Sequence, residues 1–177
     1  MSKPATTHRR DASAPPPRLY LDVGKTPAPE LVLALFAFLL HFAWELVQVP
    51  LYADMATAAH ADATLVCLKA TLGDVAMALV AYWGAAVWMR DRRWLFGPTP
   101  AALAIYLLIG LLLTVVFELL ATGPLERWRY GAAMPVVPGL GVGLSPLMQW
   151  VLIPPFALWL ARRHMAGAAA LKASQLR

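Results

Sequence analysis

Polar side chains that can exchange protons lie inside an apolar stretch of the sequence, LLHFAWELVQVPLY, residues 39–52. His41, Glu45 and Gln48 are spaced about one helical turn apart there, so on a helix they share one face. An ionisable side chain at the centre of a membrane helix costs about 2.5 kcal/mol or more, and such residues commonly mark functional sites. A buried carboxylic acid beside hydrogen-bonding groups can give or take a proton, so this stripe predicts acid–base chemistry.

Three other apolar segments carry polar residues with a similar spacing. These residues are Thr71 and Asp74; Thr114, Glu118 and Thr122; and Gly141, Ser145 and Gln149. Helices that alternate in direction and rise about 1.5 Å per residue bring these positions to a similar depth. We therefore expect the four stripes to surround a polar pocket in the outer half of a bilayer. Lys69 falls at the same depth, and structural pairing of Lys69 and Glu118 with other charges is the alternative interpretation.

The elements that would position these residues are membrane helices. The chain has 177 residues, of which 60% are hydrophobic and 14% charged, a composition too apolar for a soluble domain of this size. About 20 mostly apolar residues are needed to cross a bilayer. Four segments pass this test: roughly 30–52, 64–89, 100–122 and 139–161. The predicted fold class is therefore an all-α polytopic membrane protein with four transmembrane helices.

The charged residues predict how this protein is divided and oriented. Residues 30–163 form the four-helix transmembrane domain, between a tail at residues 1–29 and a C-terminal tail at residues 164–177. The first tail is rich in proline and arginine and is predicted to be disordered, because it cannot bury enough apolar surface. Lys and Arg concentrate in both tails and in the second connection, whereas the first connection has none and the third has only Arg127 and Arg129. Both termini are therefore predicted to be cytoplasmic, in a bacterial inner membrane.

The segment before the fourth span is rich in proline and glycine. It reads GAAMPVVPGLGVGLSP over residues 131–146, which is more than an ordinary spanning helix tolerates without help from its neighbours. Ser145 followed by Pro146 is typical of a helix N-cap and first helical residue. The fourth span is therefore predicted to be discontinuous, with an irregular segment before the helix.

Two motifs of the second half, FELLATGPLERWRYG and GVGLSPLMQWVLIPP, carry a resemblance to a known family. Their pattern resembles the repeated three-helix domain of the heterodimeric lycopene cyclases, at Glu118, Trp128, Tyr130, Pro146 and Leu147. That resemblance implies a membrane enzyme that protonates a polyene by means of paired glutamates. Met148 and Gln149 stand where the family places those glutamates, so the acid must come from Glu45, Asp74 or Glu118. More loosely, the whole chain is similar to small proteobacterial inner-membrane proteins.

The leading hypothesis is an enzyme that acts on a prenyl, carotenoid-like or other lipid-soluble substrate. A buried carboxylic acid would protonate a double bond, and aromatic residues would stabilise the cation formed. The predicted catalytic residues are Glu45, Asp74 and Glu118; the predicted substrate-binding residues are His41, Gln48, Trp128, Tyr130 and Gln149. The expected partners are membrane lipids and a lipid-soluble small molecule, in a homo-oligomer or a hetero-oligomer if the chain assembles.

Other functions stay open at this stage. The same carboxylates would serve a proton-coupled transporter or channel subunit, and the stripe would also suit a non-catalytic assembly subunit. His41 and Glu45 have the spacing of two metal ligands, but a hydrogen-bonded packing role is the more common one for a lone membrane histidine, and we expect no metal and no cofactor. Nucleic-acid binding is not expected, because the basic residues flank the apolar segments instead of forming a patch with interleaved aromatic residues.

Overall fold

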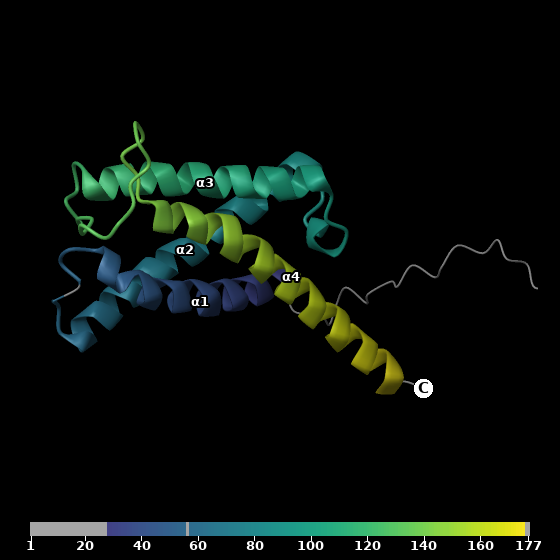
Figure 1. Ribbon diagram of the computed structural model, residues 1–177. Coiled ribbons are helices and arrows are strands. Elements are labelled where there is room, and N and C mark those ends of the chain that lie inside the picture. Colours follow the sequence, from purple (N-terminus) through teal and green to yellow (C-terminus); the bar gives the residue numbers. More distant parts are fainter. Residues whose placement is uncertain (1–27, 56, 176–177) are drawn as a thin grey trace, which may run out of the picture.

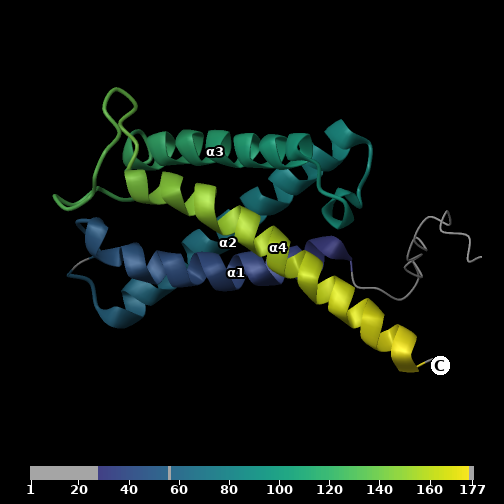
Figure 2. The same cartoon turned by 45° about the vertical axis from the view of Figure 1, so that its right-hand side comes forward.

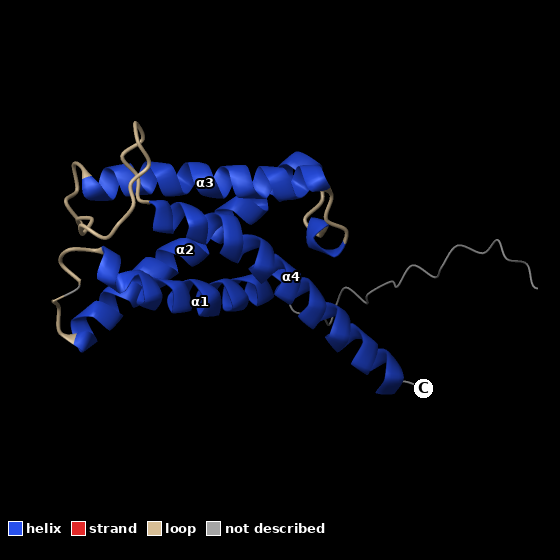
Figure 3. Cartoon of the chain, in the orientation of Figure 1, coloured by secondary structure: helices blue, strands red, loops and turns tan. Residues whose placement is uncertain are grey.

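The computed structural model describes residues 28–55 and 57–175, and within them the protein is all-helical (Figures 1 and 3). Most of the predicted N-terminal tail, and the last two residues, lie outside the described part. Four helices are long and apolar enough to cross a membrane, which confirms the predicted all-α class and the predicted number of apolar helices. The elements in chain order are α1 (Pro29–Gln48), η1 (Val49–Leu51), α2 (His60–Met89), η2 (Trp94–Phe96), α3 (Pro100–Thr122) and α4 (Leu144–Gln175).

The four helices form a bundle in which each helix packs against two neighbours. Both α1 and α3 contact α2 and α4, so α1 and α3 lie diagonally opposite one another. The α1–α2 and α3–α4 connections share one end of the bundle, which the predicted orientation makes the outer end, and η2 lies at the other end (Figure 1). In Figures 1 and 2, α4 crosses the bundle obliquely and its C-terminal part extends beyond the other helices.

Local sequence signals account for several helix ends. Pro29 and Pro100 lie in the first turns of α1 and α3, where a missing backbone N–H costs nothing. The hydroxyl of Thr99 caps α3 by accepting a hydrogen bond of 3.1 Å from the backbone N–H of Ala102. Arg90 ends α2 in a left-handed conformation with φ 52°, a common way to terminate a helix.

The boundaries of the fourth span differ from those predicted. The helix begins at Leu144, not near residue 139, and continues to Gln175, so the predicted boundary between residues 163 and 164 falls inside α4. Gly139 and Gly141 have φ of 78° and 75°, a conformation that no right-handed helix contains. The backbone N–H of Val137 donates to the carbonyl of Val142 at 2.9 Å, which closes a turn there. An irregular segment therefore precedes the helix, as predicted.

The predicted N-cap at Ser145 is wrong. Leu144 already belongs to α4, and the hydroxyl of Ser145 hydrogen-bonds to side chains of α1 instead of capping its own helix. The first span ends earlier than residue 52, because the chain tightens into η1 at Val49–Leu51, around Pro50. The second helix begins at His60, before the predicted residue 64.

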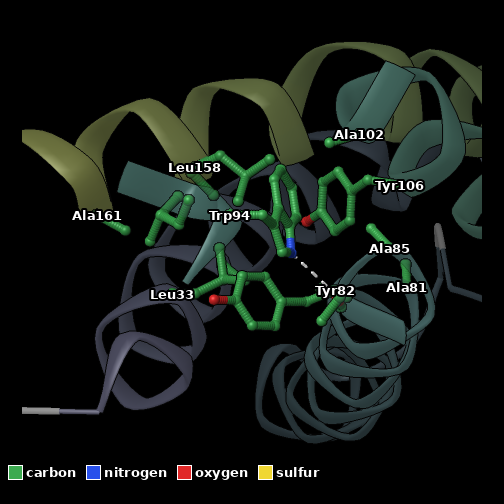
Figure 4. Packing of buried hydrophobic residues seen from close by; sticks show 14 of the residues in the cluster. Leu33, Ala81, Tyr82, Ala85, Trp94, Ala102, Tyr106, Leu158 and Ala161 are labelled. Carbon is green, nitrogen blue, oxygen red and sulfur yellow. Dashed lines mark hydrogen bonds between the residues drawn. The ribbon is translucent and has the colours of Figure 1, made fainter. Parts of the chain in front are cut away.

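The half of the bundle nearer η2 has an apolar, aromatic core. The connection between α2 and α3 folds back so that Trp94 is almost fully buried between Tyr82 and Tyr106 (Figure 4). The Trp94 ring centroid lies 5.2 Å from that of Tyr82 and 5.8 Å from that of Tyr106, and its indole N–H donates to the Tyr82 carbonyl at 3.2 Å. Leu33 and Leu158 pack around these rings. We call Tyr82, Trp94 and Tyr106 the aromatic plug.

A glycine allows the closest helix contact in the centre of the bundle, which gives a test of the packing. A Cβ atom at Gly110 would lie 2.2 Å from Cζ3 of the buried Trp150. Gly110→Ala should therefore lower the free energy of unfolding by about 1–3 kcal/mol, measured as a lower midpoint of thermal unfolding in detergent micelles. The control is Gly73→Ala, where a Cβ atom meets nothing within 4 Å and alanine favours the helix by about 1 kcal/mol. An unchanged midpoint for Gly110→Ala would contradict this packing.

The predicted orientation is tested by reporter fusions. A reporter active only outside the cytoplasm should give signal when it is fused after Ala61 or Gly131, which lie at the end of the bundle predicted to be outer. Fusions after Arg92 or at the C-terminus should give none, because the positive charges there favour the cytoplasm. A signal from the C-terminal fusion would exclude the four-span topology.

Candidate functional site

Side chains of three helices meet at the amide nitrogen of Gln149, in the second turn of α4. This nitrogen lies 2.8 Å from Nδ1 of His41, 3.1 Å from Oδ2 of Asp74 and 3.3 Å from Oε1 of Glu45. His41 and Glu45 come from α1, and Asp74 comes from α2. We call these four residues the Gln149 cluster. Their convergence follows from the predicted faces of the three helices.

The cluster is shielded from solvent. His41 is fully buried and Gln149 nearly so, while Asp74 is 8% exposed and Glu45 is partly buried. His41 Nδ1 lies 3.4 Å from Asp74 Oδ2, and this is the only ion-pair contact made by either carboxyl group among the described residues. No described Lys or Arg therefore forms a salt bridge that would offset the negative charge of Glu45 or Asp74.

The Gln149 amide faces more acceptor atoms than it has N–H bonds. The Gln149 amide has two N–H bonds but three acceptor atoms around it. If the amide is turned over, its oxygen instead accepts from its neighbours, which must then carry protons. An amide nitrogen does not accept hydrogen bonds, so either two of the three acceptors share one N–H bond or, with the amide turned over, both carboxyl groups are protonated and the imidazole carries its hydrogen on Nδ1. The cluster therefore brings two carboxyl groups and an imidazole, all groups that can take up or release a proton, within hydrogen-bonding distance of one amide.

A chain of hydrogen bonds continues from Glu45 toward the outer end. Oε1 of Glu45 accepts from the Gln48 amide at 2.8 Å, and the Gln48 oxygen accepts from the Ser145 hydroxyl at 2.8 Å. The Ser145 hydroxyl in turn accepts from the indole N–H of Trp44 at 3.2 Å. These contacts connect α1 with the start of α4, so they fix the side chain of Glu45 as well as the helix pair.

A second group of polar side chains surrounds Glu118 near the end of α3. The Glu118 carboxylate accepts hydrogen bonds from the hydroxyl of Tyr130 and from the indole N–H of Trp128, the latter at 3.4 Å. The Tyr130 hydroxyl also accepts a hydrogen bond of 2.9 Å from the backbone N–H of Gly143. Burial raises the pKa of Tyr130, and the hydrogen bond to Glu118 raises it further, so Tyr130 stays protonated and donates. We call Glu118, Trp128 and Tyr130 the Glu118 cluster.

The structure thus divides the predicted site residues into two groups. One hydrogen-bonded network contains His41, Glu45, Gln48, Asp74 and Gln149. The Glu118 cluster contains the other three, Glu118, Trp128 and Tyr130. Among the described residues no direct hydrogen bond joins the two groups. Lys69 is exposed on α2 and belongs to neither.

Other members of the predicted stripes have local roles. The hydroxyl groups of Thr114 and Thr122 donate to backbone carbonyls of their own helix, at 3.0 and 2.8 Å. Gly141 lies in the turn before α4 and is not on a helix face, so its place in the fourth stripe was wrong. The rigid turn at this glycine separates it from Ser145 and Gln149.

Two aromatic residues near the clusters escaped the sequence analysis. Trp44 reaches Ser145 across the α1–α4 interface, and its spacing of four from Gln48 was a signal for a shared face. Tyr52 packs its ring 5.8 Å from that of Tyr130 and 6.4 Å from that of Trp128. No spacing rule relates Tyr52 to those rings, because the contact depends on how two connections fold.

In the described segments, no group of three or more His, Cys, Asp or Glu side chains is arranged to hold a metal ion. Comparison of the chain with protein-family models, curated proteins and solved structures finds no match.

The Gln149 amide should be essential for the stability of the cluster. Gln149→Leu has a similar size but leaves three buried acceptors without their common donor, so the free energy of unfolding should fall by about 1–3 kcal/mol. Thermal unfolding in detergent micelles measures the change. Met148→Leu is the matched control, because Met148 is 38% exposed on the same helix and the exchange conserves volume. Equal midpoints for the two variants would show that the amide does not hold the cluster together.

Proposed function

We propose that this protein is a multi-pass inner-membrane enzyme in which the Gln149 cluster performs acid–base chemistry on a lipid-soluble substrate of the prenyl or carotenoid type. The observation that carries the proposal is the meeting of two carboxyl groups and an imidazole at one amide nitrogen, within 3.3 Å. Helices of this length and hydropathy support a meeting point inside a bilayer, where a substrate would arrive from the lipid.

The geometry supports different roles for the two carboxyl groups. Asp74 is paired with His41, which suits a base that holds a proton between two groups. Glu45 is less buried and is connected through Gln48 to the outer end, which suits an acid that is reloaded with protons from that side. Gln149 and Gln48 orient the acid and exclude water from it.

The reaction class follows from these roles. The acid adds its proton to one carbon of a double bond, and the other carbon becomes cationic. The base then removes a proton from a carbon next to the cation, which forms a new double bond or completes a ring closure. The protons balance, and no oxidant or reductant is required. Trp150, whose ring lies 5.6 Å from that of His41, is the aromatic side chain that borders the cluster on the α4 side.

The resemblance to the lycopene cyclases supports the choice of substrate class. Gln149 occupies a position where that family places a glutamate, and in this protein two carboxyl groups approach the same position from α1 and α2. The acid would therefore be supplied to an equivalent place by Glu45 or Asp74. In the Glu118 cluster the third predicted carboxyl group is engaged by Tyr130 and Trp128, so a role at the outer end suits it better than a direct role in catalysis.

The aromatic plug favours an enzyme over a transporter. A proton-coupled transporter needs alternating access from both sides of the membrane. Here the polar network extends toward the outer end, while the other half of the bundle is filled by the aromatic plug and its aliphatic neighbours. A centre reached from one side is what acid–base catalysis requires, and a conducting path would have to cross the plug.

Amide variants test the proposed site. Glu45→Gln and Asp74→Asn preserve shape and remove charge, so the protein should reach its normal level in the membrane by immunoblot. Each variant should abolish complementation of a deletion strain, and lipids or pigments analysed by mass spectrometry should show the same substrate accumulating as in the deletion. Normal level with full complementation by both variants would reject the acid–base function. Loss of the protein itself would indicate structural pairing, because a buried charge left unpaired costs about 3–5 kcal/mol.

A further inference from the structure

We propose that residues 124–143, between α3 and α4, form a lid that controls access to the Gln149 cluster and that opens when Glu118 takes up a proton. The proposal rests on the proposed function only for what passes under the lid. The lid itself is argued from its contacts with the outer end of the bundle, where Figure 1 shows this connection beside the ends of α1 and α3.

Backbone hydrogen bonds attach the lid to the segment that follows α1. The N–H of Gly131 donates to the Leu51 carbonyl at 2.8 Å, and the N–H of Ala53 donates to the Arg129 carbonyl at 2.9 Å. A Cβ atom at Gly131 would lie 3.2 Å from the Leu51 oxygen, so glycine allows this close approach. The lid therefore bridges the ends of α1 and α3, which are diagonally opposite in the bundle.

The Tyr130 side chain fastens the lid from inside. Its hydroxyl donates to Glu118 on α3 and accepts from the N–H of Gly143 at the far end of the lid. Its ring also lies 3.1 Å from where a Cβ atom of Gly143 would be, so a larger residue there would require the ring to shift by a few tenths of an ångström. One side chain thus connects the C-terminal end of the lid with α3.

Beyond these hydrogen bonds and the ring contacts of Tyr52, the lid buries few side chains. Residues 123–127 are exposed, and Met134 and Val142 are the hydrophobic side chains that it buries. The ion pair between Arg129 and Asp54 is exposed on the outer surface, where such pairs contribute little. Segments with few buried apolar contacts open at a low cost in free energy. The hydrogen bonds to Glu118 are the charge-assisted contacts that hold the lid closed.

The protonation state of Glu118 sets the strength of this fastening. As a carboxylate it accepts two hydrogen bonds, and bonds to a charged acceptor are about twice as strong as neutral ones. Protonation removes the charge and adds an O–H that competes with the two donors. The titratable groups that face Glu118 are Tyr130 on the lid, Tyr52 after η1, and Asp74 and Glu45 on α2 and α1. The lid is therefore closed at high pH and loosens as the pH falls through the titration of Glu118.

The single cysteine of the chain reports on opening. Cys67 is buried on the face of α2 that also carries Asp74, and its sulfur lies 3.6 Å from the Glu45 carbonyl. The experiment measures the rate of Cys67 modification by methyl methanethiosulfonate, a small neutral reagent, in detergent micelles from pH 5 to pH 9. The modification rate of the denatured protein divided by that of the folded protein at the same pH gives a protection factor. This ratio corrects for the pH dependence of the intrinsic reactivity of the thiol.

Wild-type protection should fall as the pH falls. Tyr130→Phe should lower protection at high pH by at least about tenfold, the change expected when a hydrogen bond to a charged group is lost. Glu118→Gln should show low protection at every pH, because the amide imitates the protonated acid. Asp54→Asn, which removes the exposed ion pair, should change protection by less than about threefold. Unchanged protection in Tyr130→Phe, or a wild-type pH dependence in Glu118→Gln, would overturn the proposal.

A second reporter separates opening of the lid from general unfolding. In a Cys67→Ala background, Ala78→Cys places the thiol on the same face of α2 but on the far side of Asp74 from the lid. Tyr130→Phe should leave this thiol protected. Equal loss of protection at both positions would mean that the whole bundle loosens, and the lid would be rejected. Lid opening measured in this way together with full complementation by Glu45→Gln and Asp74→Asn would keep the lid and reject the acid–base function.

Discussion

The energetic cost of polar groups on helices that are long and apolar enough to cross a membrane is the constraint on which this structure depends. Two carboxyl groups and an imidazole cannot face lipid, so α1, α2 and α4 must turn their polar faces toward one another. The Gln149 amide makes this arrangement favourable because it contacts all three groups from the fourth helix. The relative rotation of these helices is therefore set by hydrogen bonding in the outer half of the bundle, where close apolar packing is less extensive.

The other half of the bundle is held by a different kind of interaction. Trp94 folds back between Tyr82 and Tyr106, and in the centre of the bundle Trp150 packs on Gly110. These contacts are apolar and closely packed. They fix the helices at this end of the bundle, and the helices in turn position the polar residues. Arg92 adds a hydrogen bond of 2.7 Å to Glu30 at the start of α1, which ties the α2–α3 connection to the first helix. A rigid inner half and a polar outer half together suit a site that is reached from one side.

The sequence was sufficient to predict what depends on helical periodicity. Four apolar segments gave the fold class, and the shared faces of His41, Glu45 and Gln149 indicated that these residues would meet, because position on a helix follows from spacing alone. The sequence did not predict that Glu118, Trp128 and Tyr130 would form a group apart from the Gln149 cluster. Two of them, Tyr130 and Trp128, lie in a connection whose path depends on left-handed turns at Gly139 and Gly141 and on contacts with a second connection. Such paths leave no periodic signal in the sequence.

The choice of glutamine at position 149 has a physical reason. A glutamate there would bring a third carboxyl group against Glu45 and Asp74 within a low-dielectric span, and each further negative charge would need its own proton or cation. An amide can donate to two acceptors without adding charge, so the two carboxyl groups share a neutral donor and the cluster needs fewer protons. Because the Gln149 amide does not titrate, the groups of the cluster that can exchange a proton are Glu45, Asp74 and His41. The groups that exchange protons at this site would therefore come from α1 and α2, while Gln149 of α4 holds their side chains in position by hydrogen bonding.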